Sequence, residues 1–184
     1  MDPPPIKFKL DLEDFKSKLK EVLKVYIFNS LIILFFALIA YYLILNTDEI
    51  RHIVSRYRRG NWSFFLPLTR SNFNLIFWNY SLIPAIIEEV LYRGPLLVLM
   101  RCNFNITYRG NDLTKPFLII LALILNASWA TTHTIFLPVF LAGLPLYWLV
   151  FKTKAIWTST LCHCSFNLSI YFFLKIVIGL GLIR

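Results

Sequence analysis

Residues Ile83 to Leu97 read IPAIIEEVLYRGPLL, and they place two carboxylates and an arginine near the centre of a long apolar segment, Asn72 to Met100. A charged residue at the centre of a membrane helix costs about 2.5–3.5 kcal/mol, so Glu88, Glu89 and Arg93 would cost roughly 7–10 kcal/mol without partners. The segment therefore predicts groups that face these side chains: one another, other polar residues, or a water-filled cavity.

Helical geometry separates the two carboxylates. Glu89 and Arg93 are four residues apart, so they share one helix face and can form an ion pair with the acid before the base. Glu88 is rotated by about 100° from Glu89, which leaves its carboxylate free to take a proton from water. The alternative is a structural role, in which all three side chains bind membrane helices together.

The composition of the whole chain fits a membrane protein. Hydrophobic residues occupy 58% of the 184 positions and charged residues only 16%, which is too apolar for a soluble domain. Because about 20 apolar residues cross the hydrocarbon core of a bilayer, we expect an all-α, multi-spanning transmembrane helix bundle of about five spans. The expected spans are Val25–Leu45, Asn72–Met100, Phe117–Phe136, Leu137–Phe151 and Ala155–Leu182.

The N-terminal part differs from the rest. Residues 1–24 form a basic arm followed, from Asp11 to Lys24, by apolar residues at helical spacing with lysines between them. This pattern predicts an amphipathic helix on the membrane surface, ahead of a transmembrane domain over residues 25–184. The net charge of +9 comes largely from this arm and from short loops beside the spans, which favours lipid headgroups over nucleic acid as the partner.

Two of the later spans carry a histidine among apolar residues. His133 lies four residues after Trp129 in NASWATTHTIF, and Asn167 lies four residues after His163 in WTSTLCHCSFN. Either histidine alone is more simply explained as a structural residue. Three polar helix faces in one small chain, counting that of Glu88, indicate a common intramembrane site instead.

These motifs occur in a recognisable order. EEVLYR (Glu88–Arg93), WATTH (Trp129–His133) and HCSFN (His163–Asn167) together resemble the CAAX-protease and bacteriocin-processing family, also called CPBP or Abi proteins. The likeness extends over roughly Ile83 to Ser169. Trp129 departs from the family pattern, which more often has phenylalanine at this position.

The resemblance implies an intramembrane endopeptidase that hydrolyses a peptide bond of a membrane-associated or tail-inserted substrate, with a core over about residues 72–182. It implies that Glu88 with His133 activates a water without a metal, and that His163 and Asn167 stabilise the oxyanion. Glu89 and Arg93, the ion pair of the first motif, would hold the Glu88 carboxylate in its orientation. The expected location is a cell membrane, with a prokaryotic plasma membrane as the favoured host.

Three alternatives stay open at this point. One glutamate and two histidines can also bind catalytic zinc, although the chain has no His-Glu-x-x-His helix. A non-catalytic protein of the same fold could act in bacteriocin immunity or binding. A proton-coupled transporter could use the buried carboxylates, but the short chain shows no internal repeat.

The expected helix boundaries raise one difficulty. His133 would lie about 24 Å along a helix that begins at Phe117, and His163 only about 12 Å along one that begins at Ala155. Straight upright helices entering from the same side would not bring the two rings level. A joint site therefore requires a tilted helix or a third span that enters the bilayer later.

Overall fold

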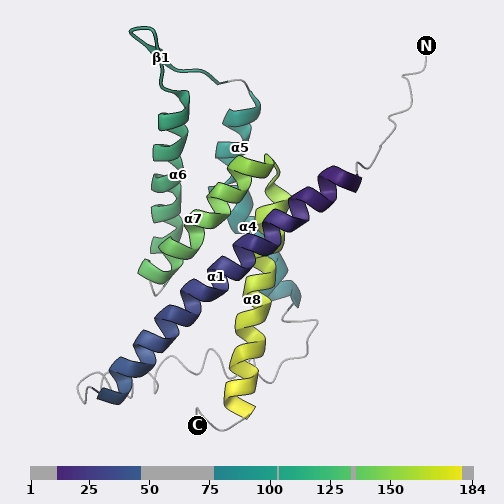
Figure 1. Ribbon diagram of the computed structural model, residues 1–184, viewed down its shortest axis with the longest axis vertical. Helices are drawn as coiled ribbons and strands as arrows, with labels where there is room; N and C mark the ends of the chain where they lie inside the picture. Colours follow the sequence, from purple (N-terminus) through teal and green to yellow (C-terminus); the bar gives the residue numbers. More distant parts are fainter. Residues whose placement is uncertain (1–11, 47–76, 103, 134–135, 180–184) are drawn as a thin grey trace.

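The computed structural model describes four stretches of the chain, residues 12–46, 77–102, 104–133 and 136–179, and these are mostly helical (Figure 1). The elements are α1 (Leu12–Asn46), η1 (Phe77–Leu82), α4 (Ile83–Tyr92), α5 (Gly94–Arg101), β1 (Thr107–Tyr108), β2 (Asn111–Asp112), α6 (Thr114–Thr131), α7 (Phe136–Thr153) and α8 (Ile156–Gly179). The two strands pair antiparallel in a small hairpin. The all-α architecture expected from the sequence is present.

Helix α1 is a single helix of 35 residues. A surface helix, Asp11–Lys24, and a first span, Val25–Leu45, were expected from the sequence, and the helix runs through the boundary between them without a break. No proline or glycine occurs between Leu12 and Asn46 to interrupt it. The basic arm before Leu12 lies outside the described residues.

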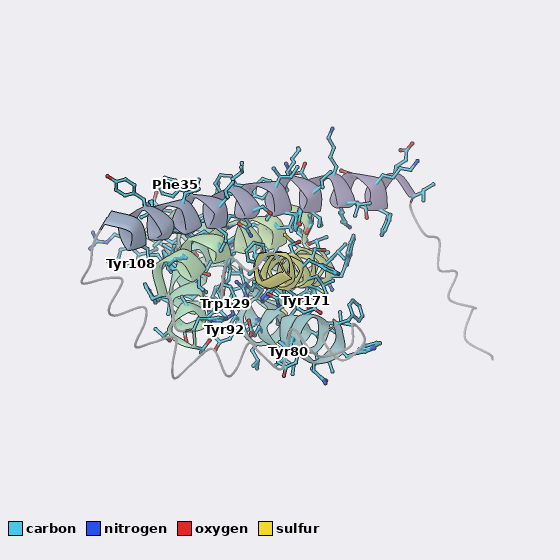
Figure 2. The ribbon with its side chains drawn as sticks, turned by 90° about the horizontal axis from the view of Figure 1, so that it is seen from below. Phe35, Tyr80, Tyr92, Tyr108, Trp129 and Tyr171 are labelled. Carbon is cyan, nitrogen blue, oxygen red and sulfur yellow. The ribbon has the colours of Figure 1, made fainter. Side chains whose placement is uncertain are left out.

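Helix α1 packs against both α7 and α8. Val22 and Val25 are buried in a cluster with residues of those two helices, and the Tyr26 hydroxyl shares a hydrogen bond of 2.5 Å with the Ser169 hydroxyl of α8. Figure 2 shows α8 between α1 on one side and the α4 region on the other. Helix α8 is therefore the central helix through which the N-terminal helix meets the site.

The segment Asn72–Met100 was expected to form one span, but it is not one continuous helix. From Phe77 it is divided into the π-helical turn η1 and the helices α4 and α5. Proline is tolerated in the first turn of a helix because the amide hydrogen it lacks has no partner there, and Pro84 and Pro95 stand in the first turns of α4 and α5. The Tyr147 hydroxyl donates to the Tyr92 carbonyl at 2.8 Å and ties this junction to α7. Residues 72–76 lie outside the described part.

The third expected span was also placed wrongly. Helix α6 begins at Thr114, three residues before the expected Phe117, and ends at Thr131, five residues before the expected Phe136. The hydroxyls of Thr131 and Thr132 donate to carbonyls of the last turn, at 2.7 Å each, and so satisfy acceptors that a helix end leaves open. His133 therefore follows α6 and is not part of it.

Helices α7 and α8 begin within one residue of the positions expected from the sequence. The expected end of the last span, residues 180–182, lies outside the described residues. Within the described part, α6 and α7 are the two helices that are long and apolar enough to cross a membrane.

A close approach between α6 and α7 depends on Gly143. A Cβ atom at this position would lie 1.9 Å from Asn126 Oδ1 and 2.7 Å from the Trp129 ring, so any larger residue would force these side chains to shift. The Asn126 side chain also donates to the Phe140 carbonyl of α7 at 2.8 Å. Small residues commonly allow such contact between membrane helices, and here the contact fixes the position of Trp129.

Candidate active site

The buried ion pair that the sequence predicted in α4 is present. Arg93 Nη1 lies 3.1 Å from Glu89 Oε1, and neither side chain is exposed to solvent. The guanidinium carbon also lies 4.3 Å from the centre of the Trp129 ring and 4.7 Å from that of Tyr147. The positive charge is thus stabilised by one carboxylate and by the faces of two aromatic rings.

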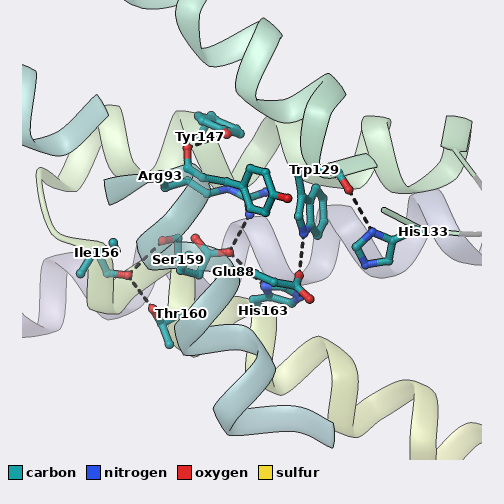
Figure 3. Close-up of polar contacts among 11 residues, drawn as sticks. Glu88, Arg93, Trp129, His133, Tyr147, Ile156, Ser159, Thr160 and His163 are labelled. Atoms are coloured by element: carbon teal, nitrogen blue, oxygen red, sulfur yellow. Dashed lines mark hydrogen bonds and ion pairs between the residues drawn. The ribbon is translucent and has the colours of Figure 1, made fainter. Parts of the chain in front are cut away.

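His163 of α8 lies between the two carboxylates of α4 (Figure 3). Its Nδ1 is 3.0 Å from Glu89 Oε1, and its Nε2 is 3.7 Å from Glu88 Oε2. A carboxylate accepts hydrogen bonds, so Nδ1 carries a hydrogen in this arrangement.

Glu88 is the accessible carboxylate of the pair. Its side chain is 27% exposed, whereas that of Glu89 is 0% exposed. Trp129 of α6 donates a hydrogen bond from Nε1 to Glu88 Oε2 at 2.6 Å. A phenylalanine could not make this bond, so the departure of this chain from the family pattern gives Glu88 an additional fixed contact.

His133 lies just beyond the end of α6, beside the same tryptophan. Its Nδ1 is 3.1 Å from the Trp129 carbonyl oxygen, which can only accept, so in this geometry Nδ1 donates and Nε2 of the neutral ring keeps a lone pair. Among the described residues, no hydrogen bond or ion pair joins His133 directly to Glu88. The pairing of these two residues in catalysis would require a bridging water.

The two histidines belong to one site despite the difficulty raised by straight helices. The ring centre of His133 is 5.0 Å from that of Trp129, and the ring centre of His163 is 5.6 Å from it, both in edge-on contact. Both rings therefore meet at the same indole, although α6 begins at Thr114, three residues earlier than expected.

A cavity of about 290 Å³ connects the second and third motifs. His133, His163 and Asn167 line it together with Trp129. Glu88 does not line it but contacts two residues that do, since it bonds to Trp129 and faces His163. A larger groove of about 800 Å³ between α5, α6 and α7 contains none of the site residues expected from the sequence.

Asn29 of α1 also lines the smaller cavity, and sequence reasoning missed it. It is only 2% exposed. The sequence did carry a signal for this residue, since Asn29 stands within the apolar run YIFNSLIIL, Tyr26 to Leu34. A polar side chain inside a membrane segment commonly marks a function.

Replacing Trp129 with phenylalanine tests the contact to Glu88. We expect kcat/KM to fall about 10-fold, because the change removes a hydrogen bond to a charged group that holds the carboxylate in place. The protein should stay folded, since phenylalanine keeps the ring between His133 and His163. Unchanged peptide cleavage by Trp129→Phe would show that the indole bond does not position Glu88.

Comparison with known proteins supports the resemblance carried by the three motifs. No curated protein and no solved structure matches the chain significantly. The family model described as type II CAAX prenyl endopeptidase Rce1-like matches residues 70–169, a range that holds all three motifs and more than half of the chain. This family consists of membrane-embedded CAAX-type proteases, and the two apolar helices α6 and α7 agree with such a location. From its motifs, its helical architecture and this match, the chain belongs to the type II CAAX prenyl endopeptidase Rce1-like family.

Proposed function

We propose that this protein is a multi-pass endopeptidase of the cell membrane that hydrolyses a peptide bond with a water activated by Glu88. The observation that carries the proposal is the position of the Glu88 carboxylate. It is partly exposed, fixed by Trp129 and directed at His163, while the neighbouring carboxylate of Glu89 is fully buried and contacts Arg93 and His163 through its Oε1 atom. Only one of the two carboxylates is thus available for proton transfer.

In the proposed reaction, a water between Glu88 and His133 attacks the carbonyl carbon of the scissile bond. The water oxygen forms the new C–O bond, and its proton passes to Glu88. The His133 Nε2 lone pair would orient the water. Collapse of the tetrahedral intermediate breaks the C–N bond, and the proton held by Glu88 goes to the leaving amine.

His163 and Asn167 line the same cavity and are the proposed oxyanion donors. Because Nδ1 of His163 already donates to Glu89, only the protonated ring can offer a second N–H, at Nε2. The amide of Asn167 would supply the other donor, and such donors contribute about 10²–10³-fold each to the rate of acyl transfer.

The family description suggests a substrate class. Its members are described as CAAX prenyl endopeptidases, which suggests peptides that end in a prenylated cysteine followed by three residues. A prenyl group anchors such a tail in the bilayer, where it could approach a site enclosed by membrane helices. We propose substrates of this kind, in a prokaryotic plasma membrane.

Hydrolysis without a metal is part of the proposal. No three histidine, cysteine, aspartate or glutamate side chains in the described stretches converge as metal ligands would, and His133 turns its Nδ1 to a carbonyl. We therefore expect cleavage by the purified protein to survive treatment with a strong chelator such as EDTA. Loss of activity in EDTA and its return on adding Zn²⁺ would instead support the metal-dependent alternative.

The substrate can be identified in cells. Membrane and secreted peptides are compared by mass spectrometry between cells that carry the wild type and cells that carry Glu88→Gln. We expect uncut precursors to accumulate in the variant and their fragments to disappear. Identical peptide sets would favour a binding or immunity role over proteolysis.

A further inference from the structure

The N-terminal helix contributes a polar group to the cavity of the second and third motifs. Asn29 is the buried asparagine of α1, and its Oδ1 atom has no hydrogen-bond partner in the described part of the chain. A buried acceptor left without a donor is unfavourable, so it needs a compensating role. The same side chain lines the cavity with His133, His163 and Asn167.

Asn29 is not needed to hold α1 in place. The hydrogen bond between Tyr26 and Ser169 already joins α1 to α8, and the ion pair of Glu21 with Lys152, at 3.2 Å, joins α1 to α7. The neighbouring Ser30 satisfies its hydroxyl within the helix by donating to the Tyr26 carbonyl at 2.9 Å. Asn29 is therefore the residue of this turn whose side-chain oxygen has no hydrogen-bond partner in the described part of the chain.

The chemistry of the ligand follows from the atom that is unpaired. An amide oxygen accepts a hydrogen bond, so its partner must offer a donor. A prenyl chain has none. A peptide that is extended for cleavage inside a membrane has backbone N–H groups that no helix satisfies, and every such group needs an acceptor there.

We propose that Asn29 is a substrate-binding residue, whose side-chain oxygen accepts a hydrogen bond from a backbone N–H of the peptide beside the scissile bond. This inference rests on the proposed peptidase function. It makes α1 one wall of the substrate site, although the family motifs lie entirely in the later helices. Ile33, one helical turn further along α1, lines the same cavity and supplies its apolar surface there.

The test uses the full-length protein in lipid nanodiscs and a fluorescence-quenched peptide that ends in a prenylated cysteine and three residues. Asn29→Ala is expected to lower kcat/KM about 10-fold, mainly by raising KM, since one hydrogen bond to the substrate is lost. Asn29→Ser, which keeps an acceptor, should recover part of the loss. Ser30→Ala is the matched control on the same helix and should cleave as the wild type does.

A second measurement identifies the bonded N–H. Each backbone amide of the probe outside the scissile bond is replaced in turn by an ester, which lacks the hydrogen. The wild type should lose about 10-fold in kcat/KM at one position, and Asn29→Ala should cleave that ester and the parent amide equally well. This comparison is internal to each variant, so a lower folded yield of Asn29→Ala does not affect it.

Two results would overturn the inference. The first is a ratio of kcat/KM for the amide to kcat/KM for the ester that is the same in Asn29→Ala and the wild type at every position. The second is an equal loss of kcat/KM in Asn29→Ala and Ser30→Ala. Neither result depends on Glu88. Failure of the proposed function would be seen separately, as cleavage by Glu88→Gln at the wild-type rate.

Discussion

Replacing Glu88 with glutamine is expected to reduce peptide cleavage by at least about 10³-fold, because the amide cannot take a proton from the attacking water. The change is nearly isosteric. The glutamine oxygen can still accept the hydrogen bond that Trp129 donates to Glu88, so the geometry around the position should persist. Initial rates with purified protein in nanodiscs measure the effect.

The controls for this variant separate chemistry from folding. The thermal unfolding temperature of Glu88→Gln should stay close to that of the wild type, because the side chain is partly exposed and is not the partner of Arg93. Glu89→Gln is the matched variant at the adjacent position and should instead lower the folded yield. A Glu88→Gln protein that cleaves at the wild-type rate would remove Glu88 from the mechanism.

Replacing Arg93 with alanine is expected to lower the free energy of unfolding by about 3–5 kcal/mol, the usual cost of leaving one partner of a buried ion pair uncompensated. Glu89 is fully buried, and Arg93, 3.1 Å from its Oε1, is the permanently charged partner of this carboxylate. The substitution also removes the cation that lies between Trp129 and Tyr147. Thermal unfolding in nanodiscs, followed by tryptophan fluorescence, measures the loss.

A double variant tests the physical reason for that loss. Glu89→Gln combined with Arg93→Met leaves no unpaired charge, and its stability should exceed that of Arg93→Ala. Arg93→Lys should restore only part of the stability, because an ammonium group does not stack between two rings as a guanidinium does. Wild-type stability in Arg93→Ala would show that the cluster does not hold α4 in place.

The parts of the site that could be predicted from sequence are those set by local geometry. The ion pair of Glu89 with Arg93 follows from a spacing of four residues on one helix, and no knowledge of other helices is needed. The contacts of His163 with Glu89 and of Trp129 with Glu88 join residues that are 74 and 41 positions apart. They depend on how α4, α6 and α8 pack, which no pattern in the sequence specifies.

The helix boundaries show a similar limit. One long span was expected over Asn72–Met100, but Pro84 and Pro95 each stand in the first turn of a separate helical piece. The end of α6 carries no glycine or proline between Thr131 and Phe136. Threonine hydroxyls bond to its last carbonyls, and hydropathy gives no sign of this local pairing.

The role of α1 was the least accessible to sequence reasoning. Its apolar run reads as an ordinary membrane span, and its lysine-rich start reads as a separate surface helix, but the structure joins both in one element. One asparagine in such a run is a weak signal in isolation. It gains meaning only because packing against α8 brings Asn29 to the cavity of His133 and His163.

The most direct test of the central claim is cleavage of a prenylated CAAX peptide by purified wild-type and Glu88→Gln protein in nanodiscs, with the products identified by mass spectrometry in ¹⁸O-labelled water. We predict that the wild type releases a C-terminal fragment and that the newly formed carboxylate carries oxygen from the solvent. Glu88→Gln, folded to the same extent, should release none. Release of the same labelled products at the same rate by Glu88→Gln would contradict a mechanism in which Glu88 activates the water.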